Sequence, residues 1–143
     1  MHDLHSNIRT KTALAPAAGT TVAGRTGKVI DRQGYGGVEF VIAYGAVTAT
    51  NATIIPVLTE GTTSSSFTSV ADADLIGTEA LAALPAQATS RTSGVGKNVS
   101  TRLGYRGNKR YLQLKYVATV TAATQVASLA ILHSPSLAPQ ANP

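Results

Sequence analysis

The stretch from residue 104 to residue 135 constrains the fold of this chain more than any other part of the sequence. It contains two long runs of residues that favour β-strands, separated by the small-residue turn TVTAAT. The first run is rich in Tyr, Leu and Val, and the second resumes with Val126, Leu129, Ile131 and Leu132. The stretch holds no reactive group of side chains. It therefore predicts a module that packs through β-strands.

Shorter β-like segments precede this pair. The clearest is residues 38–44, where Val38, Phe40, Ile42 and Tyr44 alternate with residues of the opposite face. Further strands are expected at residues 28–32, 53–59, 67–70 and 99–105. Pro56 lacks the N–H that a central strand donates, so we expect the strand that contains it to lie at an edge or to carry a bulge.

About seven or eight short strands separated by turn signals predict an all-β fold, a single-domain β-sandwich or jelly roll. The length of 143 residues suits one domain. We expect the domain body at residues 20–135. An extended N-terminal arm is expected at residues 1–19, which are polar and then rich in Ala and Pro, and an extended C-terminal tail at residues 136–143.

Alternation and composition also predict the core and one short helix. Residues 72–84, DADLIGTEALAAL, have helical composition, with Asp72 or Asp74 as the expected cap and Gly77 as an interruption. The alternating positions of the three clearest strands predict a core of Val38, Phe40, Ile42, Leu112, Leu114, Leu129 and Ile131.

Composition limits the kinds of partner. Charged residues make up only 13% of the chain, about half of the usual quarter, so much of the surface must be uncharged. The formal net charge is +5, but the basic residues are scattered and no aromatic stacking platform accompanies them. Nucleic acid is therefore not an expected partner, whereas an acidic protein lattice is compatible with this charge.

The sequence also argues against disulfide bonds and membrane-spanning segments. The chain has no cysteine, which excludes disulfides and thiolate metal sites. Its first residues lack the apolar segment of a signal peptide, and no apolar run approaches about 20 residues. We expect a soluble chain with no membrane partner.

Patterns that suggest catalysis or cofactor binding are incomplete. GVGKNVS at residues 94–100 lacks both the early glycine and the final Ser or Thr of a phosphate-binding loop. His2 and His5 have a spacing that could touch a metal, but no further ligand lies nearby in the sequence. His133 has no activated serine with an orienting acid. We expect no enzymatic activity, no cofactor and no metal.

Four segments follow one another in an informative order. They are MHDLHSNIRTKTALAP at the start, IDRQGYGGVEFVIAYG at residues 30–45, VADADLIG at residues 70–77, and LGYRGNKRYLQLKYVATVTAATQVASLAILHSP at residues 103–135. Together they resemble a group of small virion proteins of tailed bacteriophages, encoded beside the major capsid protein and acting as head decoration or cement proteins. Gly37 departs from this group, which more often has a polar residue there.

The resemblance implies a β-sandwich or jelly-roll body without catalytic residues, made in the host cytoplasm. It also implies that this body binds the major capsid protein lattice at the outer surface of the virion, as a homo-oligomer, a dimer or a trimer. The expected capsid contacts are Leu4, Ile8, Arg9, Lys11, Leu14, Arg106, Lys109, Arg110 and Leu137.

Two other functions stay open. The same virion context accommodates a head-to-tail connector or minor tail protein. A carbohydrate-binding adhesin module is the third reading, but carbohydrate sites usually present exposed aromatic side chains. This chain has no Trp, two Phe and five Tyr, and most of these lie in strand patterns.

Overall fold

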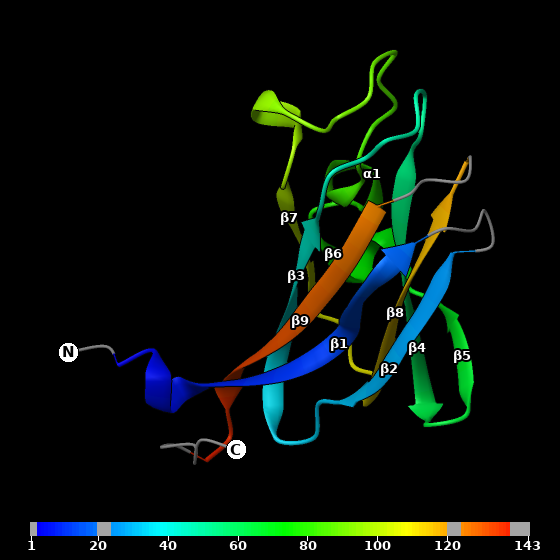
Figure 1. The fold of residues 1–143 in the computed structure, drawn as a ribbon. Coiled ribbons are helices and arrows are strands. Elements are labelled where there is room, and N and C mark those ends of the chain that lie inside the picture. The colour runs from blue at the N-terminus through cyan, green and yellow to red at the C-terminus, as the bar shows by residue number, and fades with distance from the viewer. Residues whose placement is uncertain (1–2, 20–23, 120–123, 138–143) are drawn as a thin grey trace.

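The computed structural model describes residues 3–19, 24–119 and 124–137, which form a sandwich of two antiparallel sheets (Figure 1). The five-stranded sheet comprises, in spatial order, β1 (Ile8–Gly19), β9 (Thr124–Pro135), β3 (Tyr35–Tyr44), β7 (Ser100–Tyr105) and β6 (Leu75–Ile76). The four-stranded sheet comprises β2 (Arg25–Asp31), β8 (Tyr111–Ala118), β4 (Ile54–Thr63) and β5 (Ser66–Ser69). The helical turns are η1 (His5–Asn7), η2 (Asp72–Asp74), α1 (Glu79–Ala82) and η3 (Gly94–Gly96). The predicted all-β sandwich is confirmed.

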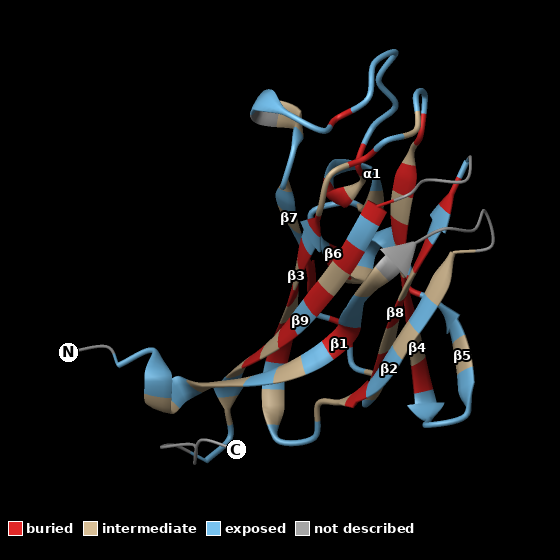
Figure 2. Cartoon of the chain, viewed as in Figure 1, coloured by how far each residue is buried: buried red, intermediate tan, exposed pale blue. Residues whose placement is uncertain are grey.

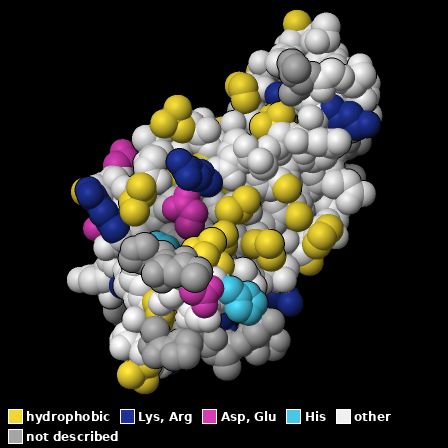
Figure 3. Space-filling model, turned by 90° about the vertical axis from the view of Figure 1, so that its left-hand side faces the viewer, with side chains coloured by type: hydrophobic (Ala, Val, Ile, Leu, Met, Phe, Trp, Pro, Cys, Tyr) yellow, Lys and Arg dark blue, Asp and Glu magenta, His cyan; other side chains and the backbone are white. Residues whose placement is uncertain are grey.

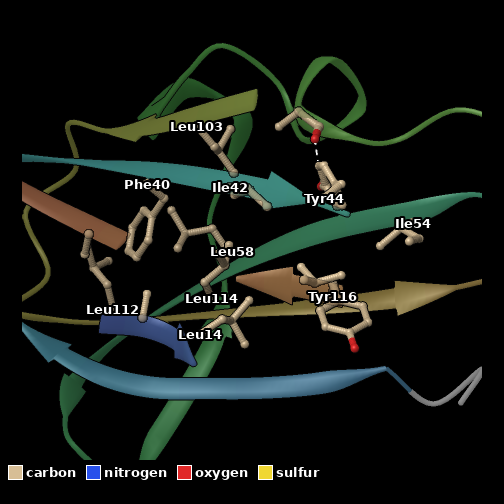
Figure 4. Close-up of a cluster of buried hydrophobic side chains, with 14 of the residues drawn as sticks. Leu14, Phe40, Ile42, Tyr44, Ile54, Leu58, Leu103, Leu112, Leu114 and Tyr116 are labelled. Carbon is tan, nitrogen blue, oxygen red and sulfur yellow. Dashed lines mark hydrogen bonds between the residues drawn. The ribbon is translucent and has the colours of Figure 1, made fainter. Parts of the chain in front are cut away.

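The core lies between the two sheets, where alternate residues of β3, β8 and β9 are buried (Figure 2). From β3 come Phe40 and Ile42, and from β8 come Leu112 and Leu114, all at most 1% exposed (Figure 4). Tyr44 closes this core at one end, because its hydroxyl donates a 2.9 Å hydrogen bond to the carbonyl oxygen of Ala82 in α1. The alternation predicted for β3 and β8 is therefore present in the structure.

The predicted core is wrong for β9, whose phase is shifted by one residue. Leu129 is 48% exposed and Ile131 is half-buried, whereas Ser128, Ala130 and Leu132 point inward. The pairing with β3 explains this arrangement. Ala130 lies opposite Phe40 and Ser128 lies opposite Ile42, so small side chains of β9 make room for large side chains of β3 in a close-packed interior. Both faces of β9 carry apolar residues, so alternation alone did not reveal which face is buried.

The predicted arm at residues 1–19 is also wrong, because most of it is a strand of the five-stranded sheet. β1 pairs with β9 from Ile8 opposite His133 to Gly19 opposite Thr124. Ala13 is fully buried and Leu14 is 2% exposed, so β1 contributes to the core. The pairing depends on backbone hydrogen bonds to a strand more than 100 residues away. The Ala- and Thr-rich sequence of β1 gives no indication of this pairing.

β1 lies at the edge of its sheet, and Arg25 of β2 covers part of that edge. The pairing with β9 shifts between Thr12 and Leu14 and again before Ala17, which accommodates Pro16 at an edge position. The Arg25 guanidinium donates to the carbonyl oxygens of Ala15 and Ala17, at 3.0 and 3.1 Å. These bonds join the two sheets along one side of the sandwich and cover carbonyls that an open edge would expose.

The segment around α1 covers a second edge. Pro56 lies on the part of β4 that pairs with β8 but not with β5, as expected for a proline at a locally free edge. Nearby, the Glu79 carboxylate accepts a 2.8 Å hydrogen bond from the backbone N–H of Leu58. The short helix predicted in this segment is present, but its cap is the Thr78 hydroxyl, which accepts from the N–H of Leu81, rather than an aspartate.

Candidate functional surface

Most of the predicted contact residues lie at one end of the sandwich. We call it the terminal end, and it consists of residues 4–9, 31–36, 106–111 and 133–137. The backbone connects these segments, because the N–H of Ser136 bonds to the carbonyl of Gly34 and the N–H of Arg32 bonds to that of Arg110. The first and last described segments of the chain belong to it (Figure 1). Segments from the start, the later middle and the end of the sequence thus meet on one surface.

Two of the predicted contact cations converge on Asp31 at the end of β2. Arg110 forms a two-pronged ion pair with the Asp31 carboxylate, at 2.9 and 2.7 Å. The Lys11 ammonium donates a 2.8 Å hydrogen bond to the Asp31 carbonyl oxygen. The hydrogen bond from Arg110 lowers the pKa of Asp31 below its ordinary value. Arg110 is therefore already paired within the chain, which reduces its value as a free contact charge.

Arg32, which was not among the predicted contacts, organises the loops of the terminal end. Its guanidinium donates to the carbonyl oxygens of Lys109 and Gly107, both at 2.6 Å, and to those of Tyr35 and Gly36. It also lies over the Tyr105 ring, 5.3 Å from the ring centroid. Arginine suits this position because it offers several donors in a rigid plane and stacks on aromatic rings. The sequence feature that could have pointed to this arrangement is the abundance of Gly and Tyr in both loops.

Tyr105 holds the same loops through hydrogen bonds of its hydroxyl group. Its buried hydroxyl donates to the Glu60 carboxylate and accepts a 3.0 Å hydrogen bond from the backbone N–H of Lys109. Burial, followed by the hydrogen bond to Glu60, raises the pKa of Tyr105. The loop that carries Lys109 and Arg110 is thus held by a buried polar network, and the cations are presented from a fixed backbone.

The remaining predicted contacts differ in exposure. Leu4 and Leu137 are 70% and 79% exposed, and Ile8 and Arg9 are half-buried at the start of β1. Arg106 is exposed, and its side chain donates to the Ala73 carbonyl oxygen. Leu14 is buried in the core, so its prediction as a contact residue is wrong. Residues 138–143 of the predicted tail lie outside the described residues.

The three histidines of this chain are His2, His5 and His133. Across the described ranges, no group of three or more His, Cys, Asp or Glu is placed to hold a metal ion. His133 Nδ1 lies 3.1 Å from Oγ of its sequence neighbour Ser134, and His2 lies outside the described residues. No helix in the described part of the chain is long and apolar enough to cross a membrane.

A second surface was not foreseen from the sequence. It is the side of the five-stranded sheet that faces away from the core, and we call it the outer face; it carries Val41, Ala43, Ala127, Leu129 and Ile131. Viewed from the side where β3 and β7 lie in Figure 1, hydrophobic side chains gather in the middle of the molecule, with charged side chains beside them (Figure 3). Burial is the largest influence on Glu39 at the border of this face, and it raises the pKa of that carboxyl.

Comparison with known proteins supports the fold. No protein-family model and no curated protein sequence matches this chain. Among solved structures, the PBSX exported protein XepA is similar with a TM-score of 0.53 at 15% identity, over 94% of this chain. The present chain spans only 40% of that XepA chain. Identity this low supports a shared fold and nothing about activity.

Two further solved structures show weaker similarity. The SPBc2 prophage-derived protein YomS has a TM-score of 0.49 at 12% identity, with 90% of this chain and 94% of that chain covered. The CBM22-1 xylan-binding domain of Xyn10C from Paenibacillus barcinonensis has a TM-score of 0.42 at 8% identity, with coverage of 93% and 87%. Neither likeness separates one function from another.

Proposed function

We propose that this chain is a structural protein of a phage virion that binds the outer surface of the capsid and bridges major capsid protein subunits. The observation that carries the proposal is the convergence at the terminal end. Leu4, Arg9, Lys109 and Leu137 come from distant parts of the sequence and lie on one surface. The order of sequence segments that resemble decoration proteins supports the same role.

The physical basis is multivalent binding to a repeated surface. A ligand that binds only the assembled shell stabilises it by RT ln(1 + [L]/Kd), which is about 2.7 kcal/mol per site at a hundredfold excess over Kd. A shell repeats this contribution over many sites, so a small protein stabilises a capsid without any chemical step.

The test compares heads with and without the protein. Heads stripped of the protein should burst at a lower temperature than decorated heads, and adding the purified chain back should restore the higher temperature in a saturable way. Equal bursting temperatures for bare and decorated heads would argue against capsid stabilisation.

Copy number separates this proposal from the connector. The chain should be present in hundreds of copies per particle on a stained gel of purified virions. A dozen copies or fewer would favour a head-to-tail connector or minor tail protein.

The carbohydrate-binding alternative has less support. Phe40, Tyr44, Tyr105 and Tyr116 are buried, and the other three aromatic residues are half-buried. A binding platform for sugars requires aromatic rings that are open to the ligand. Retention of the purified chain on immobilised host glycans would restore this alternative.

A further inference from the structure

The outer face of the five-stranded sheet is unusually apolar for a surface open to water. Antiparallel sheets that face solvent on one side normally carry polar residues there. In β9 and β3, however, Leu129 lies opposite Val41 and Ala127 lies opposite Ala43. Leu129 is 48% exposed. An apolar patch of this kind, bordered by polar residues, is typical of an interaction site.

The outer face has both a protruding and a recessed part. A hollow of about 360 Å³ lies beside Leu129 and is lined mainly by apolar side chains, including Pro16, Val41 and Ala127. A leucine that projects from one flat sheet and a hollow beside it provide the shapes that interdigitate when two sheets stack about 10 Å apart.

Charges of both signs border the apolar patch. Arg102 lies next to Val41, and Glu39 lies next to Ile131. Their contact within the chain is loose, because 3.9 Å separates Arg102 Nε from Glu39 Oε1 and the Arg102 side chain is 83% exposed. A surface that carries its own opposite charges is complementary to a second copy of itself. In a two-fold interface, each copy presents its acid to the base of the other.

The available area is sufficient for a specific dimer. The face is formed mainly by β1, β9 and β3, with 12, 12 and 10 residues, and by the six residues of β7. With strands about 4.8 Å apart and a rise of about 3.3 Å per residue, these strands cover roughly 600 Å². Two stacked copies would bury on the order of 1,200 Å² in total, above the approximately 1,000 Å² expected of a biological interface.

We propose that the outer face is a two-fold interface, through which two copies of this chain associate face to face. Leu129 lies at its centre, and Glu39 of each copy pairs with Arg102 of the other. This proposal concerns the isolated chain in solution and does not depend on the proposed binding to capsids.

The first test changes the centre of the interface. The purified full chain should sediment as a dimer in analytical ultracentrifugation, and Leu129→Glu should raise the dimer Kd by about 30-fold or more, as expected for a central hot spot. Because Leu129 points away from the core, the variant should keep the thermal unfolding temperature of the parent monomer. Val117→Glu is the matched control, since Val117 is 38% exposed on β8 of the opposite sheet; it should leave the Kd unchanged.

The second test examines the charge pair. Glu39→Lys and Arg102→Glu should each weaken the dimer, and the double variant should recover most of the lost affinity. If neither single change alters the Kd, the charges do not pair between copies.

Several outcomes overturn the proposal. They are a chain that remains monomeric at every concentration, a dimer that Leu129→Glu leaves intact, or a dimer that Val117→Glu disrupts. A monomeric parent chain that loses capsid binding on Leu129→Glu would instead assign the outer face to the lattice.

Discussion

At the scale of single residues, the terminal end depends on Arg32. Arg32→Lys should lower the free energy of unfolding by about 1–3 kcal/mol, because a lysine has one nitrogen and leaves part-buried carbonyl groups without a donor. Urea unfolding measures the loss. Arg9→Lys is the control and should stay within about 0.5 kcal/mol, as surface substitutions usually do. Equal losses for the two variants would show that the hydrogen bonds from the Arg32 guanidinium contribute little to the free energy of unfolding.

Phe40 tests the core at the same scale. It is fully buried opposite Ala130, so Phe40→Ala should lower the free energy of unfolding by about 3–5 kcal/mol through lost burial and a residual cavity. Phe67→Ala, at the half-buried position of the otherwise exposed strand β5, should cost clearly less in the same urea titration. A loss below about 1 kcal/mol for Phe40→Ala would remove Phe40 from the core that stabilises the fold.

The ion pair between Asp31 and Arg110 predicts a dependence on pH. Because the pKa of Asp31 is lower in the folded chain, its contribution to stability is complete above the ordinary value of 3.8 and is lost as the pH falls below it. Asp31→Asn should therefore destabilise the protein at pH 7, and this difference should shrink in acid. Unfolding in urea at pH 7, 5 and 3 measures the trend. Asp72→Asn, in the exposed turn η2, is the control, and an Asp31→Asn effect that is constant with pH would contradict the prediction.

At the scale of elements, β1 is needed for folding, whereas the exposed residues that precede it are not. Leu14→Ala should cost about 2–5 kcal/mol of unfolding free energy, because Leu14 is buried between the sheets. Leu4→Ala, at an exposed position before the strand, should leave stability unchanged. Deleting residues 1–7 should likewise preserve the fold, whereas deleting residues 1–19 should unfold it by exposing the core and the edge of β9. Circular dichroism with thermal melting checks all four variants. If the chain without residues 1–19 still folds, these residues form an arm outside the core after all.

At the scale of the whole molecule, the proposed contact with the capsid predicts that charge reversal weakens capsid binding at one end of the sandwich and not at the other. Lys109→Glu at the terminal end should weaken binding to stripped heads. Lys97→Glu should not, because Lys97 precedes β7 at the opposite end of the sandwich. Added salt should weaken binding of the parent chain modestly, since exposed pairs contribute less than about 1 kcal/mol each. Equal affinities of the two variants in a pelleting assay would exclude the terminal end as the contact.

The sequence by itself determined the fold class and the phase of two strands. In β3 and β8, most large apolar residues occupy one face, so the alternation of Val38, Phe40 and Ile42 and of Leu112 and Leu114 identified the buried side. The departure of GVGKNVS from a phosphate-binding loop was also readable, because that motif depends on local spacing.

Only the tertiary structure decided the place of β1, the phase of β9 and the make-up of both surfaces. β1 joins the sheet through backbone bonds to residues 124–133, and such bonds leave no pattern of side chains in the sequence. β9 is apolar on both faces, so its buried side depends on which side chains of β3 it meets. The terminal end arises for the same reason: Arg32, Lys109 and Ser136 become neighbours only when strands distant in the sequence pair and bring their loops together.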